Sequence, residues 1–438
     1  YIMSKLFKNL NKKELSWVLY DVGNSAYTLL ACALIPIWYK SLAIGNGSGQ
    51  ISSDKATAYY SLAISIMTVI SAFIGPICGT IADRRGMKKI IFSGSVVLGV
   101  AACILNGFAP SWMFFIVIYV ATKILYNASL VFYDSMINDI TTDERMDQVS
   151  SYGFAWGYLG SCVPFLAALA AYICGPDMLG FISNRTSMII GFTVTGIWWL
   201  AVTIPLMKNY KQINYTDGEK IRIFDGIISI FRTIKKIATK DKKVGLFLIA
   251  FFLYIDGVGT IIDNCINIGT DLNLNAAGQV IFLLFTQIVA YIGSLIFGRL
   301  SKKYDTINLI YVCIAGYFVV CIYALMLKNL ISFGILAFGV GCFQGAIQAL
   351  SRSYFAKIIP PENSGEYFGI YDIFAKGASF LGSAVIAGVK FAGGTINAAV
   401  AAQAIFFALG FIFLQYANRY GEKNTNSTII KNSDFANL

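Results

Sequence analysis

The chain has 438 residues, of which 57% are hydrophobic and only 13% are charged, and its mean hydropathy is +0.67. Soluble domains average roughly 25% charged residues, so this composition excludes a string of soluble domains and indicates an integral membrane protein. The formal net charge of +11 does not indicate a nucleic-acid partner, because most of the basic residues are concentrated in loops of one parity.

Twelve apolar segments are long enough to cross a bilayer as helices of about 20 residues. They span 15–40, 56–82, 90–108, 112–137, 149–173, 187–207, 243–268, 276–299, 306–327, 331–357, 366–389 and 394–419. We therefore expect an all-α membrane protein with twelve transmembrane helices in two pseudo-symmetric six-helix bundles. The expected units are residues 1–207, a cytoplasmic linker at 208–242, residues 243–419 and a disordered cytoplasmic tail at 420–438.

The distribution of Lys and Arg among the loops predicts the orientation of the chain. Of the 34 basic residues, 26 fall in the terminal segments and the even-numbered loops, and five fall in the loops of the opposite side. The remaining three, Lys123, Arg352 and Lys376, lie inside predicted spans. Because basic residues accumulate in cytoplasmic loops, we expect both termini to be cytoplasmic.

The linker at 208–242 contains an amphipathic pattern. Apolar residues recur at helical spacing from Phe224 to Ile234, with Arg232, Lys235 and Lys236 nearby. This pattern predicts a helix that lies on the anionic surface of the cytoplasmic leaflet. A calmodulin-like or nucleic-acid target has the same signature, but a membrane chain makes the lipid surface the favoured partner.

Residues 79–89 form a short basic block, GTIADRRGMKK, between the second and third predicted spans. A weaker copy, GRLSKKYD, begins 219 residues later at Gly298, which is half the chain length. Repetition at this spacing, between membrane-length segments, indicates two related halves that move against each other to carry a solute. In the copy, Lys302 stands where the first half has Asp83, so the corresponding contact of the second half must be chemically different.

Twelve spans in two repeats, together with Gly79, Asp83, Arg84, Gly86, Lys88 and Lys89 in this block, resemble the major facilitator superfamily. Met87 stands where that signature often has Arg. Three stretches resemble the autophagy-associated vacuolar amino-acid effluxer group and its bacterial relatives. They are LSWVLYDVGNSAY, FFLYIDGVGTI and QALSRSYFAKIIPPENSGEYFGIYD. The resemblance implies amino-acid efflux by alternating access. Through the bacterial relatives, it also implies a location in the plasma membrane of a bacterial cell.

The superfamily resemblance also implies a gating role for the basic block. The loop carboxylate of Asp83 is expected to meet the N-terminus of the eleventh helix, where unpaired N–H groups favour negative charge. Asp83 and Arg84 would then hold the cytoplasmic side closed, helped by Gly79 and Gly86. The alternative is that the basic residues of the block only determine topology.

Polar residues inside the spans carry the information about a substrate, because a charge near the bilayer centre costs at least about 2.5–3.5 kcal/mol and so usually faces a cavity or a partner. These residues align on the faces of five predicted helices. The candidate substrate or coupling residues are Asp21 and Asn24; Lys123 and Asn127; Asp256 and Asp263; Gln344, Gln348 and Arg352; and Asp372 and Lys376. In the major facilitator fold, the first, fourth, seventh and tenth helices line the central cavity.

Structural explanations remain open for several of these residues. Asp372 and Lys376 are four residues apart and can simply neutralise each other. Asp21 and Asp256 occupy related places in the first and seventh helices and can cap neighbouring backbone instead of facing a cavity. Asp263, like Asp134 of the fourth helix, can lie near the membrane surface, where ionisation is less costly.

One pairing follows from the repeat itself. An offset of 218 residues places Asp134 opposite Arg352, so pseudo-twofold equivalents carry opposite charge. We hypothesise that they form a salt bridge between the halves that closes the inward exit. Reversal of both charges is then expected to restore transport that either single reversal abolishes.

A cavity that offers cations and carboxylates suits a zwitterion, in agreement with the amino-acid transport that the resemblance implies. An intramembrane carboxylate can also bind a coupling proton. Histidine is absent, the nine cysteines form no C-x-x-C pair, and there is no G-x-x-x-x-G-K-[ST] motif, so we expect no cofactor, no metal site, no enzyme activity and no direct use of ATP. We expect a monomer whose partners are a small solute and the lipid bilayer. The alternatives are an exporter of lipophilic cations or drugs, and a non-transporting receptor of the same fold.

Overall fold

The computed structural model describes residues 10–45, 51–178, 183–217, 223–377 and 380–436, and these are almost entirely helical. No strand occurs in these ranges, where the single β-bridge joins Arg84 to Thr216. The predicted all-α class is therefore confirmed. The first nine residues and the other short gaps lie outside the described part of the chain.

The first half contains six long helices and one short one. They are α2 (Lys12–Ile44), α3 (Ser53–Ala82), α4 (Met87–Gly107), α5 (Trp112–Ser135), α6 (Ile137–Ile140), α7 (Asp143–Met178) and α8 (Asn184–Asn209). Side chains accept backbone N–H groups at several helix starts; those of Asn11, Ser52 and Ser111 cap α2, α3 and α5. Polar residues just before apolar runs thus fix where these spans begin.

The linker helix α9 (Ile223–Thr239) precedes the second half, which repeats the pattern with more interruptions. Its helices are α10 (Lys242–Asp263), α11 (Cys265–Asp271), α12 (Ala276–Leu300), α13 (Thr306–Tyr323), α14 (Leu330–Ile358), α15 (Ser364–Gly377), α16 (Phe380–Phe391), α17 (Ile396–Ala401) and α18 (Ala404–Ala436). Two 3₁₀ turns lie at Ala324–Met326 and Pro361–Asn363. The amphipathic helix predicted within the linker is confirmed as α9, although the side chains of Phe224 and Ile227 lie outside the described residues.

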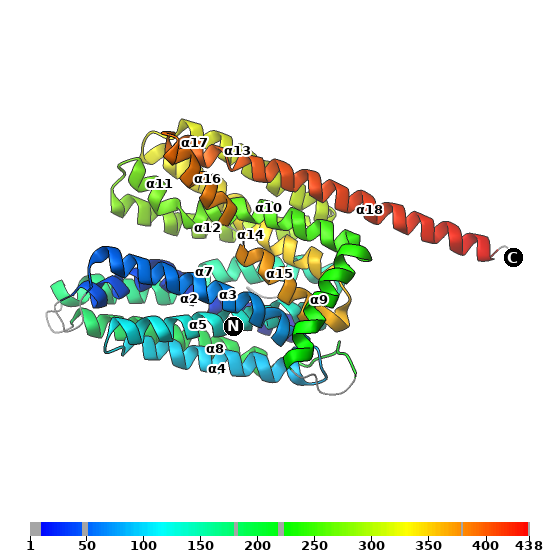
Figure 1. Cartoon of the computed structure of the whole chain (residues 1–438), viewed down its shortest axis with the longest axis horizontal. Coiled ribbons are helices and arrows are strands. Elements are labelled where there is room, and N and C mark those ends of the chain that lie inside the picture. The colour runs from blue at the N-terminus through cyan, green and yellow to red at the C-terminus, as the bar shows by residue number, and fades with distance from the viewer. Residues whose placement is uncertain (1–9, 46–50, 179–182, 218–222, 378–379, 437–438) are drawn as a thin grey trace.

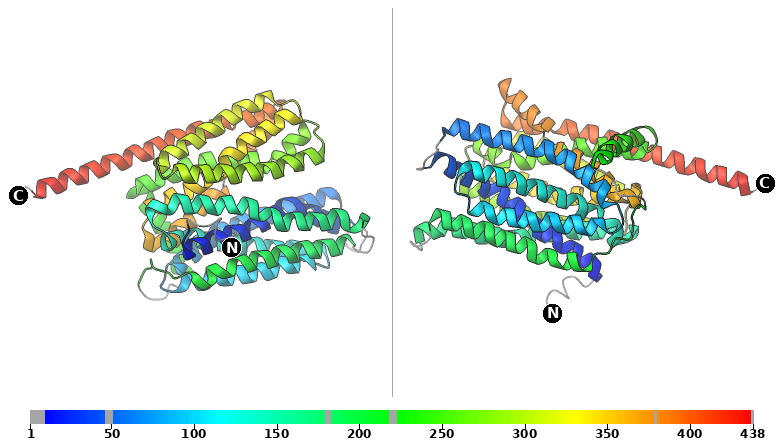
Figure 2. Two further views of the ribbon diagram at one scale, coloured as in Figure 1. Left: turned by 180° about the vertical axis from the view of Figure 1, so that it is seen from behind. Right: turned by 60° about the horizontal axis from the view of Figure 1, so that its bottom comes forward.

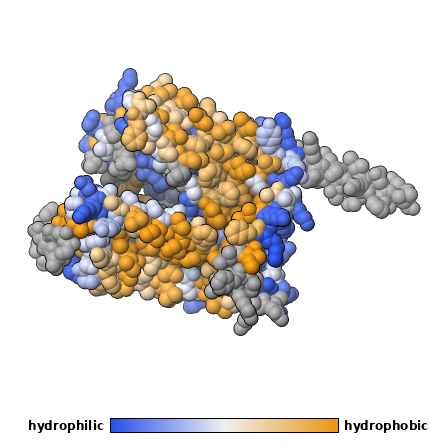
Figure 3. Space-filling model, in the orientation of Figure 1, coloured by the Kyte–Doolittle hydropathy of each residue, from blue (hydrophilic) through white to orange (hydrophobic). Residues whose placement is uncertain are grey.

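In the described part of the chain, eleven segments are long and apolar enough to cross a membrane, and α2 supplies a twelfth in two pieces bent by 41°. Pro36 explains the bend, because proline cannot donate to the carbonyl four residues earlier and its ring crowds that carbonyl. Apolar residues cover the middle of the molecular surface, and hydrophilic residues gather at its two ends (Figure 3). The twelve predicted spans are therefore confirmed.

The two halves lie one above the other in Figure 1, and helix α9 joins them at one end of the molecule. We call this end the linker end and the opposite one the distal end. Two sets of helices contact each other across the halves: α15 packs on α3, and α12 and α14 pack on α7. Helix α15 belongs to the second half but packs on α3 of the first, so the eleventh span connects the two bundles.

The last helix extends beyond the last predicted span. Helix α18 continues beyond the membrane-length segment to Ala436 and projects from the body at the linker end (Figures 1 and 2). Extending an existing helix needs no new nucleation, since each added residue gains one hydrogen bond. A polar sequence rich in Asn and Ser therefore remains helical when it follows an apolar span directly.

Candidate functional site

At the linker end, Asp83 caps helix α15 of the other half. One carboxylate oxygen accepts the N–H of Gly365 at 2.8 Å, and the other accepts the N–H of Glu366 at 2.9 Å. The first N–H groups of a helix have no partner within it and carry partial positive charge, so a carboxylate satisfies both needs. Burial raises the pKa of Asp83 to about 6, against the opposing effects of Lys88 and of these two N–H groups. The predicted contact with the eleventh helix is present.

The cation that accompanies Asp83 is Lys88 rather than Arg84. The Lys88 ammonium is fully buried, lies 3.4 Å from the Asp83 carboxylate and donates to the Ser364 hydroxyl at 2.8 Å. Arg84 was predicted to share this role, but its buried Nε has no hydrogen-bond partner among the described residues. Lys88 reaches the carboxylate because the chain turns directly after Asp83 and returns on the first turn of α4, and the gating role of Arg84 stays a prediction. We call Asp83, Lys88 and Ser364–Glu366 the latch.

Glycine allows α3 and α15 to approach closely enough for the latch to form. A Cβ atom on Gly79 would lie 2.2 Å from the Gly365 carbonyl oxygen, and one on Gly369 would lie 2.4 Å from the Pro76 Cα. Either contact is far inside van der Waals distance. Gly86 has a different reason: its φ of +75° places it in the left-handed region, which reverses the chain before α4.

Arg352 of α14 forms the second contact between the halves. Its side chain is 4% exposed, and its guanidinium lies 3.0 Å from Asp134 of α5 and 3.2 Å from Asp21 of α2. It also donates to the hydroxyl and carbonyl oxygens of Ser150 on α7 at 3.0 and 3.1 Å. The ion pair predicted between Asp134 and Arg352 is present, with Asp21 as an unpredicted second carboxylate. We call these four residues the Arg352 cluster.

Aromatic rings and hydroxyl groups enclose the Arg352 cluster. The guanidinium lies 4.5 Å from the ring centroid of Trp17 and 4.4 Å from that of Phe154. The Tyr133 hydroxyl donates to Asp21 at 2.7 Å, and Asn24 donates to the other Asp21 oxygen at 3.2 Å. A planar guanidinium suits this position because it stacks on rings while its N–H groups point to carboxylates in its own plane.

The third contact between the halves involves Asp147 of α7, which the sequence analysis did not identify. Its carboxylate accepts hydroxyl groups from Thr306 and Ser353 at 2.6 Å each and pairs with the Lys357 ammonium at 2.7 Å. This contact is the chemically different counterpart of the latch. Its carboxylate lies on α7, and its donors are side chains of α13 and α14, where the latch uses backbone N–H groups of α15. The sequence repeat contained a signal for this contact: at the same offset of 218 residues, Thr306 is the equivalent of Lys88 of the latch.

The remaining predicted residues divide into structural and cavity positions. Asn127 donates to Ser71 of α3 at 3.1 Å, and Asp256 accepts the N–H groups of Leu381 and Gly382 at 3.1 and 2.6 Å, so it caps α16. Capping was the structural explanation left open for Asp256. Asp372 forms an ion pair with Lys376, four residues later, which was also left open.

Lys123, Gln348 and Asp263 differ in their surroundings. The Lys123 ammonium lies over the rings of Tyr27 and Tyr126, 5.6 and 4.7 Å from their centroids. Gln348 donates across the halves to the Tyr158 hydroxyl at 3.2 Å. Asp263 is exposed at the end of α10. Of the predicted positions, Lys123 therefore offers an ammonium whose described contacts are aromatic faces.

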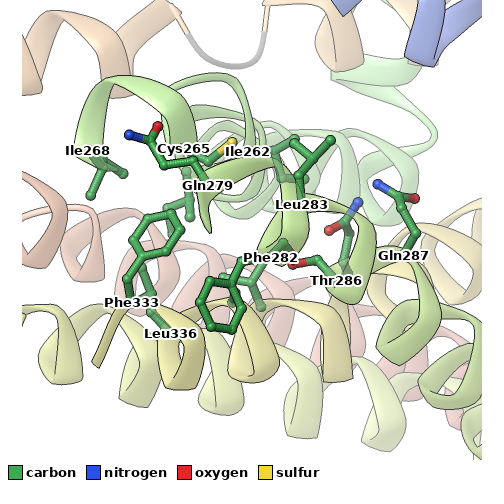
Figure 4. A pocket seen from close by; sticks show the side chains of 14 residues that line it. Ile262, Cys265, Ile268, Gln279, Phe282, Leu283, Thr286, Gln287, Phe333 and Leu336 are labelled. Atoms are coloured by element: carbon green, nitrogen blue, oxygen red, sulfur yellow. Dashed lines mark hydrogen bonds between the residues drawn. The ribbon is translucent and has the colours of Figure 1, made fainter. Parts of the chain in front are cut away.

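Gln344 faces a pocket in the second half. The pocket has a volume of about 590 Å³ including its open mouth, and α10, α11, α12 and α14 line it. Its wall is mainly apolar, with Phe282, Phe333 and Leu336 on one side and Gln279, Thr286 and Gln287 supplying polar groups (Figure 4). A wider hollow separates the two halves towards the distal end (Figure 3).

The polar contacts between the halves recorded among the described residues lie on the linker side of α14's midpoint. They include the latch, the Arg352 cluster, the Asp147 contacts and the bond from Asn138 to the Ala356 carbonyl at 3.0 Å. The linker helix joins the same assembly, since Ser229 and Thr233 of α9 donate to Glu366 at 2.7 and 2.8 Å. The molecule is thus closed at the linker end and hollow towards the distal end.

Comparison with known proteins agrees with this architecture. A family profile described as "Vacuole effluxer Atg22 like" matches residues 10–426. The chain belongs to this family. The MFS-type transporter YxiO of Bacillus subtilis is 38% identical over 414 residues, which are 94% of this chain and 96% of YxiO. Autophagy-related protein 22 of Eremothecium gossypii is 23% identical over 369 residues, 76% of this chain and 71% of that protein.

Solved structures show the same fold at low identity. FucP in the outward conformation superimposes with a TM-score of 0.69 at 13% identity, covering 92% of this chain and 98% of FucP. A bacterial homologue of ferroportin in its outward-facing state gives 0.65 at 14% identity, covering 93% of this chain and 98% of the homologue. This Atg22-family protein is therefore a multi-pass membrane transporter of the major facilitator fold, and not an enzyme, as predicted.

Proposed function

We propose that this Atg22-family transporter moves amino acids across the membrane by alternating access. The observation that carries the proposal is the asymmetry of the contacts between its halves. Buried ion pairs and helix caps join the halves at the linker end, while the distal end is hollow. Opening the linker end requires these contacts to break together, which gives the two halves two discrete arrangements.

The loop charges support a cytoplasmic linker end. The 26 basic residues of the terminal segments and even-numbered loops belong to this end, against five at the distal end. With this orientation, both termini are cytoplasmic and the structure is outward-facing. The bacterial relative supports the bacterial cell membrane as the location, and the chain is proposed to act as a monomer.

Lys123 is the proposed anchor for the substrate carboxylate. Of the three cations inside the spans, Arg352 is held by two carboxylates and Lys376 by Asp372. Lys123 has no ion pair in the described part of the chain, and Tyr27 and Tyr126 hold its ammonium in place. An ammonium in a partly dehydrated site attracts a carboxylate more strongly than it would in water.

Asp263 is the proposed partner for the substrate ammonium or for a coupling proton. It is exposed at the end of α10, in the half opposite to that of Lys123. A zwitterion can therefore bridge two opposite charges, one from each half. Binding both halves at once links substrate occupancy to their relative movement.

A second candidate, export of lipophilic cations, is favoured by the apolar pocket beside Gln344. Aromatic rings of Phe282 and Phe333 line it, and no basic side chain is among its lining residues. An apolar cation would use this wall and would not need Lys123. The role of Lys123 therefore separates the two candidates.

The test uses proteoliposomes and a panel of radiolabelled amino acids, with and without an imposed pH gradient. We expect saturable uptake of at least one amino acid, lost by more than tenfold in Lys123→Met and partly retained in Lys123→Arg. Lys40→Met, at an exposed position on the distal side, is the matched control and keeps wild-type flux. Binding without flux would indicate a receptor, and unchanged flux in Lys123→Met would refute the anchor.

A further inference from the structure

Three side-chain oxygen atoms that can each donate an electron pair to a cation converge beside Gly382, at the start of α16. A Cβ atom added to Gly382 would lie 2.1 Å from the Thr260 hydroxyl oxygen, 2.6 Å from the Gln403 amide oxygen and 2.8 Å from an Asp256 carboxylate oxygen. The three side chains come from α10 and from the turn between α17 and α18. All three are 0% exposed. A glycine at 382 leaves room that any other side chain would fill.

Two of these oxygens lack a hydrogen-bond partner among the described residues. They are the Thr260 hydroxyl and the Gln403 amide oxygen. The Gln403 amide nitrogen is satisfied, because it donates to the carbonyls of Gly382 and Ala399 at 3.1 and 3.3 Å, and this fixes which side of the amide faces the site. A buried polar atom without a partner costs about 1–3 kcal/mol. The arrangement therefore calls for a small ligand that accepts electron pairs from oxygen.

We propose that Asp256, Thr260 and Gln403 form a binding site for a small monovalent cation, with Na⁺ as the expected ion. Carboxylate, hydroxyl and amide oxygens are hard ligands, which suit alkali and alkaline-earth ions rather than transition metals. A single carboxylate balances one positive charge, whereas a divalent ion usually has more than one. Asp256 also accepts two backbone N–H groups of α16, so a bound cation would connect α10 and the turn before α18 to the start of α16.

The position of the site gives this cation a mechanical role. Helix α15 carries the latch at its start, and α16 belongs to the same predicted span. Binding at the start of α16 would tie the part of this span that follows the latch to α10. This consequence depends on the proposed function, but cation binding itself does not.

The experiment measures the melting temperature of the full-length protein in detergent, with NaCl or KCl replacing choline chloride at constant ionic strength. We expect a saturable rise in NaCl that is absent in KCl, since a ligand that binds only the folded state stabilises it by mass action. Thr260→Val and Gln403→Leu should weaken Na⁺ binding and so raise the half-saturating Na⁺ concentration by at least tenfold. Thr195→Val removes another buried, unpartnered hydroxyl, on α8 of the other half, and should keep the wild-type response.

Equal melting temperatures of the wild-type protein in the three salts would overturn the proposal and assign the site to a buried water. An undiminished Na⁺ response in Thr260→Val and Gln403→Leu would overturn it as well, because the ion would then bind elsewhere. The wild-type comparison needs no variant, so a variant that fails to fold does not affect it. No flux is measured, so this result is independent of whether amino acids are the substrate.

Discussion

Replacing Arg352 with Gln is expected to open the linker end. In the closed state, the substitution leaves the carboxylates of Asp21 and Asp134 without the guanidinium that lies 3.2 and 3.0 Å away. Removing one partner of a buried ion pair costs about 3–5 kcal/mol. Opening hydrates both carboxylates, so this penalty falls mainly on the closed state. At about 1.4 kcal/mol per tenfold, the equilibrium shifts towards the open state by roughly 150- to 4,000-fold.

The assay is a distance measurement between spin labels across the linker end. Labels at Arg85 and Tyr304, which are exposed on the loops after α3 and α12, report the separation of the two halves. They are introduced as cysteines after the nine native cysteines have been replaced. We expect one short distance in the parent protein and a longer one in Arg352→Gln, without any need to know the substrate.

The control that tests the reasoning neutralises the whole Arg352 cluster. In the triple variant Asp21→Asn, Asp134→Asn and Arg352→Gln no buried charge remains unpaired, so the short distance should largely return. A triple variant as open as Arg352→Gln alone would refute the argument from uncompensated charge. Exchange of Asp134 and Arg352 is a weaker test than the sequence indicated, since a carboxylate at position 352 would lie beside Asp21.

Three further predictions concern the latch. Gly79→Ala should lengthen the same distance and reduce transport, because its Cβ would overlap the Gly365 carbonyl, whereas Gly94→Ala, with open space around it, should have no effect. Lys88→Gln should lower the melting temperature by several degrees more than Arg84→Gln, since only Lys88 pairs with the buried carboxylate. Burial raises the pKa of Asp83 to about 6 from 3.8, so protonation favours the closed state; the gain is complete below about pH 4 and is lost as the pH rises through about 6. Asp83→Asn should remove this pH dependence of the label distance, and a persistent dependence would assign it to another group.

Much of the fold followed from local properties of the sequence. The apolar segments predicted all twelve spans, because a helix in lipid satisfies its backbone hydrogen bonds within itself and needs only length and hydrophobicity. The half-chain repeat predicted the ion pair between Asp134 and Arg352, since pseudo-twofold positions meet at the interface.

Only the tertiary structure decided which side chains meet within the site. Lys88 pairs with Asp83 because the turn at Gly86 brings the first turn of α4 back to the carboxylate. Asp21 joins Arg352, and Asp256 caps α16, through contacts that span more than 100 residues of sequence. The sequence by itself determined where helices cross the membrane and where charge is buried. The pairing of those charges depends on how closely the helices approach, and that distance is set by packing at glycines such as Gly79 and Gly382.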